Sequence, residues 1–325
     1  MKIFKTGFIL LLLIPFKSTL ANSNLNIDKI EEEIHRNFNI PSALYPKATK
    51  PIKRTDIKNS QTAMYTIVQT GRYYLDNDAI VSPSNNSSTI ITVNASNTVI
   101  DLNGMVISQA HNNSATNLDA ILVNTNVSNI LIMNGSINSL SGIGVKANSG
   151  ANNIVLMNVK INACANYGLN FSSTNNITFI NCSFTNCDAS GATSTDGAVG
   201  AHLSSCTNIA IKDCTFSHNQ EISTGKNGIG LNLSGCTDAS IENCSASSNK
   251  GDSAMGFRII SSTRGVTFKN CTANYCEATA NSGSASGFLL NASEANEFFN
   301  CRAAYNRRNS GTGVAAYGFN LGSSN

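Results

Sequence analysis

Short stretches of alternating hydrophobic and polar residues recur along most of the chain. One kind of stretch begins with a small residue, usually Gly, and places apolar residues one and three positions later, as at Leu169 and Phe171. A second kind ends at an Asn, as at Ile177 and Phe179 before Asn181. Apolar residues at every second position are typical of half-buried β-strands. The pattern therefore predicts a protein made of many short strands.

The two kinds of stretch form one unit that recurs eight times. The final Asn of each unit, here called its anchor, lies 13 or 14 residues after the first residue of the unit, and loops of variable length join the units. Units of 24 to 32 residues are too short for propeller blades, which need four strands and about 40 to 50 residues. The units also lack the leucine spacing of leucine-rich repeats. We therefore predict a solenoid in which each unit is one coil and like residues stack about 4.8 Å apart.

The anchors are expected to form a stacked ladder at a bend of every coil. An Asn amide can bond to the amides in the coils above and below, and Asn tolerates the left-handed backbone that bends need. Seven of the eight anchors are Asn and one is Asp: Asn103, Asn134, Asn158, Asn181, Asp213, Asn243, Asn270 and Asn300.

Several coils resemble a known family. The run TGRYYLDNDAIVSPSNNSSTIITVNASNTVIDLNGMVIS, residues 70–108, and the later N-C-x-F coils are similar to right-handed parallel β-helix proteins of the pectate-lyase-like superfamily, which share the pectin-lyase fold. The resemblance covers residues 65–325 and implies an all-β, single-stranded right-handed parallel β-helix of about eight complete coils. This fold hosts lyases, hydrolases, epimerases, adhesins and phage fibres, so the resemblance specifies the fold and leaves the chemistry open.

The residues before the repeat form three predicted segments. Residues 1–21 read as a signal peptide, with Lys2 and Lys5 before an apolar run that is too short to span a bilayer. Residues 22–40 carry apolar side chains at helical spacing, and the resemblance implies that such a helix caps the first coil. Residues 41–64 are predicted to be a basic, proline-containing linker. We therefore expect a secreted or cell-surface protein without a transmembrane segment in its mature chain.

The repeat stops shortly after the start of a ninth coil, and no capping sequence follows. End repeats usually differ from the consensus because they cover the open end of a solenoid. We expect that the β-helix is truncated at residue 325, so that the natural chain continues there or another chain covers this end.

Composition narrows the classes of function. Charged residues make up 13% of the chain and the formal net charge is +3, whereas a nucleic-acid-binding protein usually shows a clustered basic surplus. The ten cysteines fall into columns of the predicted coils, where their side chains would point the same way in neighbouring coils. We expect buried thiols, because a disulfide needs a particular approach of the two side chains, although export would permit disulfides. No CxxC pair is present, so no metal site and no cofactor are predicted.

The resemblance implies catalytic motifs that the coils do not carry. Polygalacturonase-like members have N-x-D, D-D, G-H-G and R-x-K elements on successive coils, and this set is absent. Pectate-lyase-like members hold calcium with carboxylates on one face, but the outward column of the first stretch contains none, so calcium is expected only if the protein is lyase-like. The remaining titratable cluster lies in and beside the loops before Gly200 and Gly230. Its candidate catalytic residues are Asp188, Asp196, His202 and Glu221.

Candidate ligand-binding residues come from the columns that like residues form along the solenoid. Tyr275 and Tyr305 lie five residues after their anchors, where they could stack on a sugar or on each other. The outward column of the first stretch holds Lys146, Asn170, His202, Asn232 and Arg258. A charged column, seven residues after the anchors, holds Asp188, Gln220, Lys250, Glu277 and Arg307.

These observations favour an exported β-helix that acts as a surface-interaction or glycan-binding module, with a polysaccharide or cell-surface glycan as its partner and no nucleic acid. One alternative is a polysaccharide lyase or glycoside hydrolase that acts in the variable loops of residues 188–228. Another alternative is a structural stalk segment of a longer adhesin. The missing motifs favour the binding module over the enzyme.

Overall fold

The computed structural model describes residues 49–57, 63–82, 88–110, 117–165, 167–188, 196–221, 225–280, 283–308 and 316–322. The chain divides into two compact units, Met1–Ser42 and Ala43–Asn325, and all of these residues belong to the second. The predicted signal peptide and the predicted capping helix of residues 22–40 lie outside the described residues.

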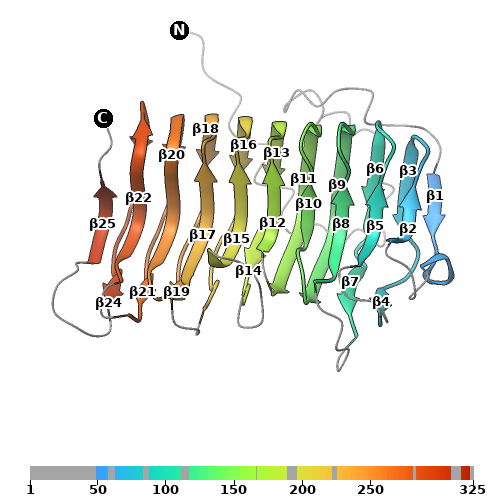
Figure 1. The fold of residues 1–325 in the computed structure, drawn as a ribbon, viewed down its shortest axis with the longest axis horizontal. Helices are drawn as coiled ribbons and strands as arrows, with labels where there is room; N and C mark the ends of the chain where they lie inside the picture. Colours follow the sequence, from blue (N-terminus) through green and yellow to red (C-terminus); the bar gives the residue numbers. More distant parts are fainter. Residues whose placement is uncertain are drawn as a thin grey trace, which may run out of the picture. The chain divides into compact units, whose positions relative to one another are not determined.

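The described strands form a right-handed parallel β-helix in which successive coils lie side by side (Figure 1). Their pairings define three walls. The first wall contains β2 (Ala63–Ile67), β5 (Thr89–Val93), β8 (Asp119–Val123), β10 (Val145–Ala147), β12 (Tyr167–Ser172), β15 (Gly197–Ser204), β17 (Asn227–Ser234), β20 (Ala254–Lys269), β22 (Ala285–Glu294) and β25 (Ala316–Leu321). The second wall contains β1 (Thr49–Ile52), β3 (Gly71–Leu75), β6 (Thr98–Asp101), β9 (Ser128–Leu140), β11 (Asn152–Cys164), β13 (Asn175–Ile180), β16 (Thr207–Lys212), β18 (Thr237–Glu242), the end of β20 and β23 (Glu297–Phe299).

The third wall is the shortest. It contains β4 (Ala79–Val81), β7 (Val106–Gln109), the ends of β9 and β11, and β14 (Ser183–Thr185), and it continues as single bridges in the later coils. A separate small sheet follows it, made of β19 (Lys250–Gly251), β21 (Glu277–Ala278) and β24 (Arg307–Arg308). A 3-10 turn, η4, covers Arg54–Asp56. The all-β class and the stack of about eight coils are confirmed.

The β-helix begins earlier than the sequence predicts. Residues 41–64 are predicted to be a linker, but β1 pairs in parallel with β3, and Ile52 stands opposite Leu75. Ile52 and Ile57 both belong to the core. Pro51 is compatible with this pairing, because β1 has a partner on one side only among the described strands. Two apolar residues among many basic ones and prolines are too weak a pattern to predict this strand.

Side chains that point into the coils form one continuous core. Its largest members are phenylalanines that stack from coil to coil. The rings of Phe257 and Phe288 lie 4.9 Å apart at 15°, and those of Phe184 and Phe216 lie 5.1 Å apart at 2°. Each such pair contributes about 0.5–1.5 kcal/mol beyond the burial of its area. Stacking of equal residues therefore helps to hold the coils in register.

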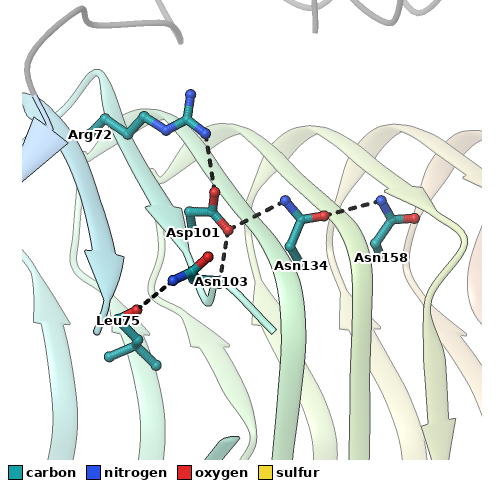
Figure 2. A network of polar contacts seen from close by, with 6 residues as sticks. All are labelled: Arg72, Leu75, Asp101, Asn103, Asn134 and Asn158. Carbon is teal, nitrogen blue, oxygen red and sulfur yellow. Dashed lines mark hydrogen bonds and ion pairs between the residues drawn. The ribbon is translucent and has the colours of Figure 1, made fainter. Parts of the chain in front are cut away.

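The anchors stand at the corner between the second and third walls, each with a left-handed φ of 50° to 60°. Asn158 Nδ2 donates to Asn134 Oδ1 at 3.3 Å (Figure 2), and Asn181 Nδ2 donates to Asn158 Oδ1 at 2.8 Å. Farther along, Asn300 Nδ2 donates to Asn270 Oδ1 at 2.8 Å. In each bond the amide of the later coil donates to that of the earlier coil.

The first predicted member of this ladder does not take part in it. Asn134 Nδ2 donates to Asp101 Oδ1 at 3.3 Å rather than to Asn103 (Figure 2). The reason is a local turn, in which the Asn103 N–H binds Asp101 Oδ1 at 2.9 Å and the Asn103 amide donates to Leu75 O at 3.1 Å. Arg72 holds the other carboxylate oxygen of Asp101 at 3.1 Å, so the ladder ends on an ion pair.

The ladder is also interrupted at the one acidic anchor. Asp213 Oδ1 accepts from Asn243 Nδ2 at 3.1 Å, as an Asn oxygen would. An ionised carboxylate has no N–H to donate, however, so Asp213 gives no side-chain bond to Asn181 in the earlier coil. The seven predicted members other than Asn103 therefore form two separate hydrogen-bonded segments.

A second ladder, which the sequence analysis does not predict, stands five or six residues before the anchors. Its members also have left-handed φ angles, and their amides are joined at 2.6 to 2.8 Å. A sequence signal exists, because most of these residues directly precede an Ile that begins the buried part of the strand. The members are Asn97, Asn129, Asn153, Asn176 and Asn208.

The cysteines are free thiols, as predicted. Nine are buried and Cys301 is partly exposed. Thiols that follow an anchor close the corner, because the S–H donates to the carbonyl two residues earlier, as Cys214 does to Lys212 O at 3.2 Å. Another column lies deeper, where burial raises the pKa of Cys187 to about 12. The thiols of this deeper column act as small, protonated core residues.

Candidate functional site

The predicted outward column lies on the first wall, with its members in register across the coils. Lys146 pairs with Asn170, Asn170 with His202, His202 with Asn232, and Asn232 with Arg258. Asn232 is fully buried, whereas the other four are partly exposed. The column is therefore less open to solvent than the alternation predicts, and Asn232 cannot reach a ligand unless neighbouring side chains move.

His202 belongs to a cluster of side chains that come from neighbouring coils. Asn232 Nδ2 lies 2.9 Å from His202 Nδ1, and Asp196 Oδ2 lies 3.8 Å from the same nitrogen. Arg258 Nη1 holds the other oxygen of Asp196 at 3.2 Å. The ring of Tyr167 packs on the imidazole with the centroids 5.4 Å apart. The structure thus brings together two predicted catalytic residues and three members of the predicted binding column, with His202 common to both sets.

The environment of His202 favours the neutral imidazole. Burial lowers the pKa of His202, the Asp196 carboxylate opposes this effect, and the Arg258 guanidinium lowers the pKa further. When Nδ1 accepts a bond from Asn232 Nδ2, the proton of the neutral ring lies on Nε2. The cluster therefore consists of an Asp–Arg ion pair beside a neutral histidine.

The other two predicted catalytic residues lie on different columns. The Asp188 N–H donates to Cys164 O at 3.1 Å, after the third wall. Glu221 is buried, and its N–H donates to Lys250 O at 2.8 Å beside the small sheet. Of the four predicted catalytic residues, the structure shows direct contact between Asp196 and His202.

Tyr275 and Tyr305 project from the corner that follows the third wall. Both have a left-handed backbone, with φ of 59° and 56°, which is uncommon for a bulky residue. Their rings stack 5.0 Å apart at 9°, and the residues are 57% and 65% exposed. The pair therefore presents aromatic surface to solvent.

A groove of about 680 Å³ lies over this corner. Glu277 and Arg307, which lie two positions after the tyrosines, line the same groove. Lys250 Nζ lies 2.9 Å from Glu277 Oε1, and Arg307 Nη2 lies 2.6 Å from Glu277 Oε2. Hydrogen bonds from Lys250 and Arg307 lower the pKa of Glu277, although burial opposes them. The groove is lined by Gln220, Ser248, Lys250, Tyr275, Glu277, Tyr305, Asn306 and Arg307.

Both parts of this groove are predicted from the sequence, but as two separate columns. The tyrosines stand five residues after the anchors and the charged column stands seven residues after them. A separation of two residues is the signal that could have united them, since residues i and i+2 of a strand point to one side.

The part of the chain that the structure describes shows neither a metal-binding cluster nor a membrane-spanning helix. There, no group of three or more His, Cys, Asp or Glu side chains is arranged to hold a metal ion. The same residues contain no helix whose length and hydropathy would let it cross a bilayer.

Comparisons with known proteins agree with this architecture. A family model described as a right-handed β-helix region matches residues 192–325. The crystal structure of pectate lyase Pel9A superposes with a TM-score of 0.51 at 10% sequence identity, over 75% of this chain and 69% of that chain. A search of curated protein sequences finds no match.

Two further solved structures superpose less well. Full-length tailspike protein 2 from the Escherichia coli O157:H7 bacteriophage CAB120 has a TM-score of 0.40 at 15% identity, over 77% of this chain and 37% of that chain. The Streptococcus pneumoniae surface protein and adhesin PfbA has a TM-score of 0.37 at 11% identity, over 79% of this chain and 92% of that chain. The protein is a right-handed parallel β-helix protein with the pectin-lyase fold. At these identities the likeness concerns the fold and not the activity.

Proposed function

We propose that the protein is an exported β-helix module that binds a glycan in the groove at Tyr275 and Tyr305. The observation that carries the proposal is the solvent-exposed, stacked tyrosine pair in that groove. Aromatic faces pack on the apolar faces of sugar rings, while neighbouring polar groups bind the hydroxyls. The charged column supplies such groups directly beside the rings. Export rests on the predicted signal peptide of residues 1–21.

The alternative explanation for these side chains is that they only stabilise the fold. The partners of Glu277 in its two ion pairs are 37% and 68% exposed, and ion pairs that are open to solvent contribute little to stability, about 0–1 kcal/mol each. The left-handed backbone of the two tyrosines is strained. Because their side chains are exposed, they add no core packing that would offset this strain. Fold stability therefore does not explain the exposed tyrosines at this corner, whereas ligand binding does.

The proposal is tested by retention of the purified protein on a panel of immobilised acidic and neutral polysaccharides. Tyr275→Ala is expected to weaken retention about tenfold, because it removes one stacking face of about 1 kcal/mol or more. Tyr275→Phe keeps the ring and should bind nearly as well. Phe299→Ala removes an exposed aromatic residue outside the groove and serves as the matched control.

Two outcomes would overturn the proposal. Equal retention of Tyr275→Ala and the unchanged protein would remove the groove as the binding site. Release of new reducing or unsaturated ends that disappears in Asp196→Ala and His202→Ala would instead place a catalytic site at the His202 cluster.

A further inference from the structure

We infer that the tyrosine groove selects a polysaccharide that carries carboxylate or sulfate groups, and that the polymer lies along the axis of the β-helix. This inference rests on the proposed function, because it names the ligand class of the same groove. The supporting observations are the charges beside the tyrosine pair and the N–H groups there that donate to no described acceptor.

The groove has a net positive charge. Its lining contains two cations, Lys250 and Arg307, and one anion, Glu277. Glu277 is 8% exposed, and each of its carboxylate oxygens is held by one of the two cations. Because three hydrogen bonds from the two cations already reach these oxygens, little acceptor capacity of this carboxylate remains for sugar hydroxyls.

Donors outnumber acceptors in the groove. Lys250 has three N–H groups and gives one to Glu277, while Arg307 has five and gives Nε–H and one Nη2–H to the same residue. Two ammonium donors and three guanidinium donors are therefore uncommitted among the described contacts. Asn306 turns its amide to the backbone, at 3.3 Å from Ala273 O and 3.1 Å from Tyr317 O. Lys and Arg donors form their strongest hydrogen bonds with negatively charged oxygens, such as those of carboxylate groups.

The shape of the groove gives the direction of the ligand. Its lining residues come from four successive coils, at Gln220, Lys250, Glu277 and Arg307 in one column. Three coil spacings amount to roughly 14 Å along the axis. A linear polymer that follows this column passes the tyrosine pair and meets both cations, whereas one that crosses it meets one coil.

The charge of Glu277 provides the decisive test. Glu277→Gln changes the net charge of the lining from +1 to +2 while keeping the shape of the side chain. For an acidic polymer this variant should bind about two- to fivefold more tightly, since it adds one partly screened attraction. A neutral sugar that used Glu277 as an acceptor would lose affinity. The matched control is Glu242→Gln, which removes the central acid of the Lys212–Glu242–Lys269 row on the second wall.

The probes are hyaluronan and alginate, each beside its neutral methyl ester, and chondroitin sulfate beside its desulfated form, which keeps the carboxylates, and its desulfated methyl ester, which is neutral. We expect tighter binding of Glu277→Gln to the charged forms, no change with Glu242→Gln, and weaker binding as salt is raised. Carboxylated and sulfated polymers separate the two sources of charge. Salt-independent binding of the neutral forms that Tyr275→Ala abolishes would overturn this inference and keep the proposed function. Tyrosine-independent binding to every polymer would overturn both.

Discussion

At the scale of the residue, the corners of this β-helix depend on left-handed backbone and on what the side chain can do there. Asn suits both needs, because it tolerates this conformation and its amide both donates and accepts. Asp213 meets the conformational need, with φ of 54°, and accepts the amide of Asn243. It leaves Asn181 without a donor from the next coil, so this corner is less stable than its chemistry allows.

Asp213→Asn should therefore stabilise the protein by about 0.5–1.5 kcal/mol, because the new Nδ2 can donate to Asn181 while Oδ1 still accepts from Asn243. Urea unfolding followed by circular dichroism measures the change. Asn270→Asp is the matched control, since it removes the 3.1 Å donation to Asn243 and should destabilise by a similar amount. A loss of stability in Asp213→Asn would show that the missing ladder bond is not what limits the stability of this corner.

At the scale of the element, a glycine stands at or near the start of every strand of the first wall from the third repeat unit onward for a steric reason. A Cβ on Gly230 would lie 2.5 Å from Gly256 O, and one on Gly256 would lie 2.6 Å from Gly287 O. The backbone of the next strand thus occupies the space of a side chain. The recurring Gly of the sequence marks close approach of the coils at this point.

Gly230→Ala is expected to destabilise the protein by about 1–3 kcal/mol, because a neighbouring strand has to move. Gly235→Asn is the contrasting variant in the same coil. There φ is +64°, the nearest atom to an added Cβ lies at 3.5 Å, and Asn accepts this conformation, so stability should change by less than about 0.5 kcal/mol. Thermal unfolding of the two variants compares them directly. Equal losses of stability in the two variants would contradict this expectation, because they would mean that the strand next to Gly230 moves at no cost in free energy.

At the scale of the whole molecule, the β-helix is a row of neighbouring interfaces, and no disulfide joins its described coils. Stability of such a solenoid is close to a sum over adjacent coils. The ten cysteines contribute as packed thiols. Alkylation of the denatured protein without reductant should add ten labels per chain by mass spectrometry, and a reductant should leave the melting temperature unchanged. Fewer labels would show that the protein forms disulfides.

The repeat predicted the architecture, because every coil offers the same alternation and equal residues must stack. The strand at Thr49–Ile52 escaped prediction, since prolines and lysines mask its few apolar residues. The site was less predictable for a different reason. Sequence spacing places Tyr275 beside Glu277, but the burial of Asn232 and the contact of Asp196 with Arg258 depend on side chains from other coils. Such contacts have no local pattern.

The direction of the asparagine ladders bears on how the chain could be built. Each amide donates to the coil before it, from Asn158 to Asn134 and from Asn208 to Asn176. A coil that has just emerged during synthesis or passage through a membrane thus finds its acceptors already in place. Within these two ladders, each side-chain bond that a new turn donates goes to the preceding turn. The order of the sequence can therefore also be the order of assembly, with each turn serving as a template for its successor.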